Sequence, residues 1–498
     1  TQEKSGGPIT GDMNGPEVYG TIFSVGPSKK DVNTIFTGSD DGLVFVTRDF
    51  GKIWTNITPK DMPEFGRVSQ LDASSHDAGT VYMSVRRPLL DDHKPYIFKT
   101  NDYGRTWTKI VNGLGAEDYV HAVREDPTRR GLLYAATQHG VYISYDDGAN
   151  WQSLKLNLPD VPVADLIVER DELVIGTHGR GFWVMDNIAP LRQATPAVQA
   201  ASRHLFAPAV GLRSSPGVTL SWRFATRPVR GTLAILDSAG SVVREFTGDT
   251  AMQAAAGGGG RRRGTSSTFP LAAGLTRFTF DLRSTGIESF PGMILWGAGT
   301  AGPALPPGRY TVRLTADGEE LKAPLRIQRS PLIPDVTDAD LRRQYAFGKQ
   351  VRDKTNEAQR AVIEIRRVKA QLDDRYKRAN DEATLKAKGE TLRKNASAVE
   401  ENVYQVRNQS GQDPLNFPIK VNNRLANLLA MSERGDGPPG TYMPEILSIL
   451  SKELAGYQAT LDRVWKTDLP AVNAELARLK LPPVDPKCTV VTGCSATP

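Results

Sequence analysis

The hydrophobic and polar positions of this chain follow two different periods. Up to about residue 330, short apolar runs alternate with turns rich in Gly, Asp and Asn, a pattern that predicts antiparallel β-strands. From Asp338 onward, apolar residues recur at steps of three and four, which predicts amphipathic helices. The sequence therefore predicts a multidomain chain that is mainly β and then α.

The helical region, predicted over residues 331–485, contains two long apolar stripes, then helices over 419–434 and from Pro444 to about Leu479. The first stripe comprises Leu341, Tyr345, Thr355, Ala358, Val362, Ile365, Leu372 and Tyr376, and the second Leu385, Leu392, Val399, Val403 and Val406. A Gly- and Pro-rich segment at 435–440 separates the last two helices, and Pro470 predicts a kink. The expected product is an antiparallel bundle, with a partner-binding coiled coil as the alternative.

Three segments repeat one motif, Ser/Thr-x-Asp-x-Gly-x-x-Trp. They read TRDFGKIW (47–54), TNDYGRTW (100–107) and SYDDGANW (144–151). From Asp49 to Asp102 is 53 positions and from Asp102 to Asp146 is 44, periods that suit one four-stranded β-propeller blade each. A fourth blade is predicted around 173–186, although this segment lacks the Gly and Trp of the motif.

The motif residues have a structural explanation. The Asp side chain can accept hydrogen bonds from its own tight turn, the Gly permits a positive φ, and the Trp supplies a large surface for burial between strands. These residues, the Asp-box residues, are therefore predicted to specify the fold rather than to act as catalytic acids or metal ligands. They are Asp49, Gly51, Trp54, Asp102, Gly104, Trp107, Asp146, Gly148 and Trp151.

The Asp boxes, the run GTHGRGFW (176–183) and the segment QVRNQSGQDPLNFP (405–418) resemble secreted bacterial BNR-repeat proteins. These proteins are similar to the sortilin (Vps10-like) β-propeller and are often labelled glycosyl hydrolases. The resemblance spans nearly the whole chain. It implies that residues 1–193 are four blades of a larger propeller, whose remaining blades lie upstream or on another chain.

The segment between the blades and the helices predicts a second β-domain. Residues 194–205 have the composition of a linker, and residues 206–330 contain hairpin patterns expected of an Ig- or FnIII-like β-sandwich. Within it, GGGGRRRG (257–264) predicts a mobile loop.

Strand alternation predicts one ligand-facing surface. The turns before and after a given strand lie on opposite sides of a blade, so the Asp-box turns share one side and the preceding Gly-containing turns share the other. Polar residues of these Gly turns could bind sugar, peptide or metal, although they could equally be simple turn formers. The candidate binding residues are Asp40, Asp41, Asp91, Asp92, His93, His139, His178 and Arg180, with His139 and His178 expected close together near the ring axis.

Composition narrows the function classes. The net charge of +6 is mild for 498 residues and does not require nucleic acid. No apolar run is long enough to span a membrane. The only two cysteines, Cys488 and Cys494, lie in a C-terminal tail (486–498) and predict a local disulfide, which favours a secreted, periplasmic or cell-surface protein.

No catalytic constellation is complete in the sequence. Nucleophile elbows, zinc-protease motifs and phosphate-binding loops are absent, and no carboxylate pair is singled out. No catalytic residue, metal ligand or cofactor is therefore predicted. The expected function is extracytoplasmic and non-catalytic, with a propeller face that recognises protein or glycan. The alternative is a glycoside hydrolase whose active site is completed by absent N-terminal blades.

Overall fold

The computed structural model describes residues 20–213, 215–251 and 267–492. The predicted loop at 257–264 and Cys494 lie outside these residues. The chain forms two compact units, divided after Pro196. Strands precede a C-terminal helical region, which confirms the predicted order of β and α structure.

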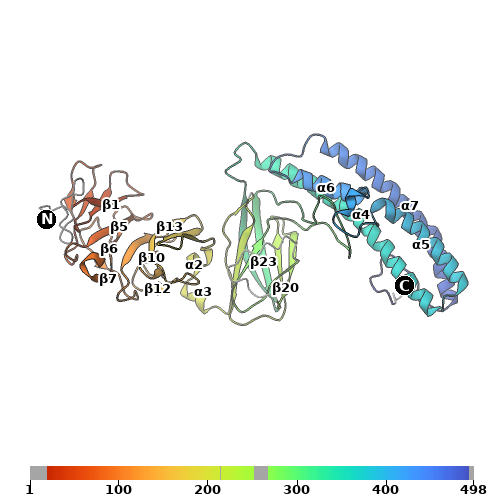
Figure 1. Ribbon diagram of the computed structural model, residues 1–498, viewed down its shortest axis with the longest axis horizontal. Helices are drawn as coiled ribbons and strands as arrows, with labels where there is room; N and C mark the ends of the chain where they lie inside the picture. The colour runs from red at the N-terminus through yellow and green to blue at the C-terminus, as the bar shows by residue number, and fades with distance from the viewer. Residues whose placement is uncertain (1–19, 214, 252–266, 493–498) are drawn as a thin grey trace. The chain divides into compact units, whose positions relative to one another are not determined.

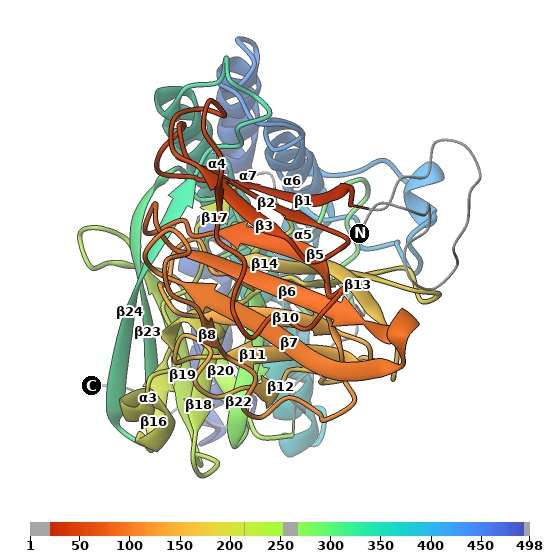
Figure 2. The ribbon, with the colours of Figure 1, turned by 90° about the vertical axis from the view of Figure 1, so that its left-hand side faces the viewer.

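Four small antiparallel sheets follow one another along the first unit (Figures 1 and 2). Sheet 1 contains β1 (Ile22–Pro27), β2 (Ile35–Ser39), β3 (Val44–Thr47) and β4 (Thr55–Asn56). Sheet 2 contains β5 (Arg67–Ala73), β6 (Val81–Arg87), β7 (Asp92–Thr100) and β8 (Thr108–Lys109). Sheet 3 contains β9 (Val120–Glu125), β10 (Leu133–Thr137), β11 (Gly140–Ser144) and β12 (Gln152–Ser153). Sheet 4 contains β13 (Val163–Glu169), β14 (Glu172–Thr177) and β15 (Phe182–Met185).

Backbone hydrogen bonds place the turns of each sheet on two opposite sides. The Asp-box turn bonds to the turn between the first and second strands, as in Tyr103 N–H to Gly79 O at 3.0 Å. The turn between the second and third strands bonds instead to the segment entering the sheet, as in Gln138 N–H to Tyr119 O at 3.1 Å. We call these the Asp-box side and the Gly-turn side.

Neighbouring sheets pack through apolar cores, and the Asp-box Trp residues cross these interfaces. The indole N–H of Trp107 in sheet 2 donates to the Ile57 carbonyl, which follows sheet 1, at 2.6 Å. The indole N–H of Trp151 in sheet 3 donates to the Ile110 carbonyl, which follows sheet 2, at 2.9 Å. Each of these sheets therefore depends on a carbonyl supplied by the sheet before it.

The two ends of this series are open. Trp54 of sheet 1 is 42% exposed and donates to Gly51 O in its own turn. Sheet 4 has three strands rather than four, and its Phe182 is 85% exposed. Across the described part of the chain, the sheets do not close into a ring, so the structure contains blade-like sheets but no closed propeller.

The second unit begins with two sheets around one core. The smaller sheet contains β16 (Arg203–Leu205), β18 (Val218–Phe224) and β22 (Gly274–Phe280). The larger sheet contains β17 (Gly211–Leu212), β19 (Gly231–Leu236), β20 (Val242–Asp249), β21 (Thr268–Pro270), β23 (Gly308–Ala316) and β24 (Glu319–Gln328). The segment 194–205, interpreted from the sequence as a linker, contains helix α3 (Pro196–Ala200) and β16, which pairs with β18 in the smaller sheet. Helix α2 (Ala189–Gln193) precedes it in the first unit.

Four helices follow: α4 (Asp338–Arg378), α5 (Ala383–Val403), α6 (Val421–Ser432) and α7 (Met443–Arg478), with Pro470 inside α7. Thr337 and Asp340 form a capping box at the start of α4. The predicted stripe residues Leu341, Val362 and Leu372 are fully buried. The two sheets and the helical region of this unit are joined by ion pairs, such as that of Arg213, which follows β17, with Asp436 of the α6–α7 loop, 3.0 Å apart.

Candidate functional site

The Asp-box carboxylates are occupied within their own turns. Asp102 accepts from the Thr106 amide at 2.9 Å, the Thr106 hydroxyl at 2.7 Å and the Thr100 hydroxyl at 2.8 Å. Asp146 accepts from the Asn150 amide and the Ser144 hydroxyl, both at 2.8 Å. The Thr106 amide is the main reason that the pKa of Asp102 lies below its ordinary value. These bonds leave the carboxylates little capacity for a ligand.

Replacing Asp102 by Ala is expected to lower the free energy of unfolding by about 1–2 kcal/mol, because three donors lose their acceptor. Urea denaturation of the full chain measures the change. Asp61→Ala is the matched control, because Asp61 is exposed and accepts no hydrogen bond within the described residues. Equal stability of the two variants would refute a structural role for Asp102.

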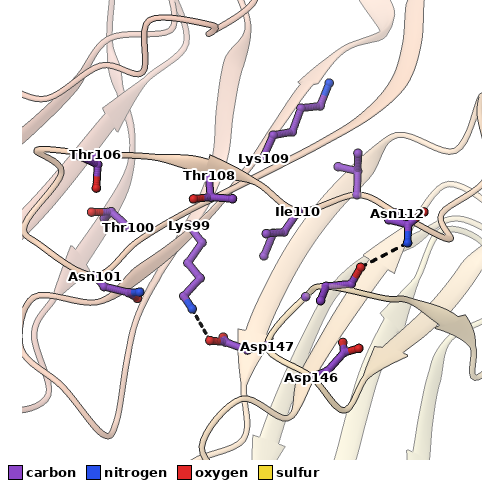
Figure 3. Close-up of a pocket in the computed structure, with 13 residues that line it drawn as sticks. Lys99, Thr100, Asn101, Thr106, Thr108, Lys109, Ile110, Asn112, Asp146 and Asp147 are labelled. Atoms are coloured by element: carbon purple, nitrogen blue, oxygen red, sulfur yellow. Dashed lines mark hydrogen bonds and ion pairs between the residues drawn. The ribbon is translucent and has the colours of Figure 1, made fainter.

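An open groove of about 790 Å³ lies on the Asp-box side between sheets 2 and 3 (Figure 3). Most of its polar groups already have partners in the chain. Lys99 pairs with Asp147, and the Asn112 amide donates to Ala149 O at 3.3 Å. Lys109 lies 4.4 Å from the centre of the Tyr96 ring. The groove is therefore a poorer candidate for ligand binding than its size implies.

Several predicted residues of the Gly-turn side are also occupied. Asp40 accepts from the Gly20 amide at 2.9 Å, and Asp41 accepts from the Ser39 hydroxyl. Asp92 accepts from Arg87 and the Tyr96 hydroxyl, each at 2.8 Å. Burial acts to raise the pKa of Asp92, but hydrogen bonds from Tyr96, Lys94 and Arg87 outweigh it and hold that pKa below its ordinary value.

The remaining predicted residues lie in or beside the corresponding turns of sheets 2, 3 and 4. Asp91 is exposed and lies 4.0 Å from His93, and the exposed Arg180 extends from the β14–β15 turn. His139 bonds to Asp160 at 3.0 Å. In the described part of the chain no contact joins His139 to His178. His178 instead lies within electrostatic reach of His121, which the sequence did not single out.

His121 belongs to a group that we call the Arg–His cluster, formed by strand ends and turns on the Gly-turn side. Its Nδ1 lies 3.0 Å from a guanidinium nitrogen of Arg86, and its Nε2 lies 3.4 Å from the Gln138 side-chain oxygen. The Tyr119 ring lies 5.1 Å from the His121 ring and 5.9 Å from the His93 ring, centre to centre. The cluster comprises Arg67, Arg86, His93, Tyr119, His121, Gln138 and His178.

The electrostatics of the cluster favour the neutral form of His121. Burial, and then the Arg86 charge, lower the pKa of His121 to about 4. Because a guanidinium only donates, Nδ1 of His121 accepts from Arg86 and its Nε2–H donates to Gln138. Burial, and then the neighbouring Arg67, lower the pKa of Arg86. The cluster therefore concentrates positive charge on its arginines.

No group of three or more His, Cys, Asp and Glu side chains within the described ranges is arranged to hold a metal ion. None of the helices in these ranges is both long and apolar enough to cross a membrane. Near the cluster, Asp118 is buried and accepts from the His139 amide at 3.0 Å.

No family model matches the sequence, and no curated protein matches it. Solved structures give distant likenesses. A GH74 xyloglucanase from Xanthomonas campestris is 14% identical over 41% of this chain and 35% of its own, with a TM-score of 0.27. A GH74 enzyme from Niastella koreensis is 12% identical over 61% and 46%, with a TM-score of 0.28. YCF48 from Cyanidioschyzon merolae is 15% identical over 46% and 73%, with a TM-score of 0.27.

The matched part of this chain therefore corresponds to less than half the length of these GH74 enzymes. None of these structures is a sortilin-like protein, the group that the motifs of this chain resemble.

Proposed function

We propose that this chain is an extracytoplasmic, non-catalytic binding or assembly module that recognises protein or glycan through the Gly-turn side of its first unit. The observation that carries this proposal is the Arg–His cluster. It brings cationic, aromatic and amide side chains from three successive sheets to one surface. Loop and strand-end positions of this kind are where rigid β-scaffolds place ligand contacts.

The contrast between the two sides of the sheets supports this choice. On the Asp-box side, carboxylates and lysines are held in internal bonds. On the Gly-turn side, His178 is exposed and Gln138 is bonded only loosely to His121. An oxidising location fits Cys488, which is disulfide-bonded, while its predicted partner Cys494 lies outside the described residues.

The second candidate is a glycoside hydrolase whose active site is completed by further blades. Hydrolysis requires two carboxylates across the scissile bond, about 5–10 Å apart. Asp118 is the acidic residue that acts electrostatically on His121, and its carboxylate is buried in bonds to its neighbours. Asp92 is occupied by Arg87 and Tyr96. The surface thus offers cations and rings rather than a free carboxylate pair.

The test combines a binding assay with a turnover assay. The full chain is screened against plant and bacterial polysaccharides and an extracytoplasmic protein extract, and new reducing ends are measured in parallel. We expect binding without turnover. The Gln138→Ala/His178→Ala variant should bind at least 10-fold more weakly with an unchanged melting temperature.

Lys109→Ala, in the groove on the Asp-box side, is the control and should bind normally. If Lys109→Ala loses binding and the Gln138→Ala/His178→Ala variant does not, the ligand binds the Asp-box side and the proposal is wrong. Release of reducing ends that disappears in Asp118→Asn would favour the hydrolase.

A further inference from the structure

Arg86 is a partly buried cation without an acidic partner. Two other partly buried arginines of the first unit form ion pairs, Arg87 with Asp92 and Arg192 with Asp126, each at 2.8 Å. Within the described residues no carboxylate lies within ion-pair distance of Arg86, and its hydrogen bond goes to the imidazole of His121. Removing a charge from water without a counter-charge is unfavourable, so this arrangement is costly in the unliganded protein.

A second arginine increases this imbalance. Arg67 is the register partner of Arg86 on the neighbouring strand, and the two charges repel each other. The Arg67 guanidinium lies 4.9 Å from the centre of the Phe23 ring, and it too forms no ion pair in the described part of the chain. Two arginines at paired strand positions, neither with an acidic partner, provide planar groups with several donors, which is what carboxylates bind.

The wall beside these cations is aromatic. His93, Tyr119 and His121 form a row of rings with centres 5.9 and 5.1 Å apart. Both ring nitrogens of His121 are bonded within the cluster, and the side-chain amide of Gln138 provides an uncharged NH₂ donor. Rings of this kind pack against the C–H faces of sugars, and neutral polar groups bond to hydroxyls.

We infer that Arg67 and Arg86 bind the carboxylate of a uronic-acid residue in an acidic polysaccharide, with the sugar ring lying against Tyr119 and its neighbouring rings. This inference rests on the proposed binding function and specifies the ligand of that same surface. A sugar acid satisfies both parts of the cluster, because its carboxylate neutralises the arginines while its ring and hydroxyls meet the aromatic and amide groups. An acidic peptide would use the arginines alone.

The experiment is isothermal titration calorimetry of the full chain with oligogalacturonate, its neutral methyl ester and a poly-glutamate peptide. Arg67→Met and Arg86→Met are compared with Arg48→Met. Arg48 is a matched control, since it is an exposed arginine on the Asp-box side that packs on the Tyr103 ring. Melting temperatures verify that each variant folds.

We expect oligogalacturonate to bind, with affinity falling as salt rises. Each cluster variant should bind at least 10-fold more weakly, Arg48→Met should bind normally, and the methyl ester should bind at least 10-fold more weakly than the acid. Arg86→Lys keeps the charge but loses the planar fork, and should lose part of the affinity if the carboxylate is held by paired donors.

Equal binding of the ester, or unchanged binding in both cluster variants, would overturn the inference. Binding of poly-glutamate but not of oligogalacturonate would assign the arginines to an acidic protein and also overturn it. If a neutral polysaccharide binds through Gln138 and His178 while the acid does not, only this inference fails. If nothing in either screen binds the Gly-turn side, the proposed function fails with it.

Discussion

Replacing Trp151 by Ala is expected to lower the free energy of unfolding by about 3–5 kcal/mol, the usual cost of removing a buried Trp. The Trp151 side chain is 5% exposed, lies in the core between sheets 2 and 3, and donates to the Ile110 carbonyl across the interface. The variant loses this packing and leaves the carbonyl without its donor. Chemical denaturation of the full chain, followed by circular dichroism, measures the change.

Trp54→Ala is the matched control because Trp54 occupies the same motif position in sheet 1. Its ring is 42% exposed and its N–H bonds within its own turn, so we expect a cost below about 1 kcal/mol. A loss at Trp54 as large as that at Trp151 would mean that sheet 1 is covered in solution. Trp151→Phe, which keeps an aromatic ring but not the N–H, should fall between the wild type and Trp151→Ala.

Acidification from about pH 6.5 to pH 4 is expected to remove up to about 3 kcal/mol of stability through His121 alone. The pKa of His121 is about 4 in the folded chain and 6.5 when unperturbed. The unfolded chain therefore takes up a proton in this interval while the folded chain does not. This contribution is complete above pH 6.5, is lost as the pH falls towards 4, and levels off below that value.

Stability curves of the wild type and His121→Gln between pH 4 and 7 test this expectation. The difference between the two curves isolates His121 from carboxylates that titrate nearby. An NMR titration that gives His121 an ordinary pKa would contradict the prediction, as would equal slopes for wild type and His121→Gln.

The sheets and helices could be predicted because their signals are local. Each Asp box contains its own hydrogen-bond donors, its positive-φ Gly and its Trp within eight residues, as in 100–107. The stripe through Leu341, Val362 and Leu372 likewise depends only on helical spacing. Such features depend on residues that are close in sequence, so they can be predicted without knowing the tertiary structure.

The Arg–His cluster could not be found in this way. Arg67, Arg86 and His121 lie in three different strands and belong to no motif. Their proximity depends on the register of β5 with β6 and on the packing of sheet 2 against sheet 3. The sequence analysis selected the most polar residues of the Gly-containing turns, and three of them, Asp40, Asp41 and Asp92, are bonded within the chain.

The indole-to-carbonyl bonds between sheets all run from a later sheet to the sheet before it. Unfolding of the first unit from its two ends should therefore not be equivalent. Trp107 relies on Ile57 and Trp151 relies on Ile110, while no bond of this kind returns from a later sheet to an earlier one in the described residues. If sheet 1 unfolds, the indole of Trp107 loses its carbonyl partner Ile57 and becomes exposed to solvent, as Trp54 of sheet 1 was before. Each step of unfolding from this end therefore leaves a terminal sheet with an exposed Trp, as in an array where each repeat contacts only its neighbours.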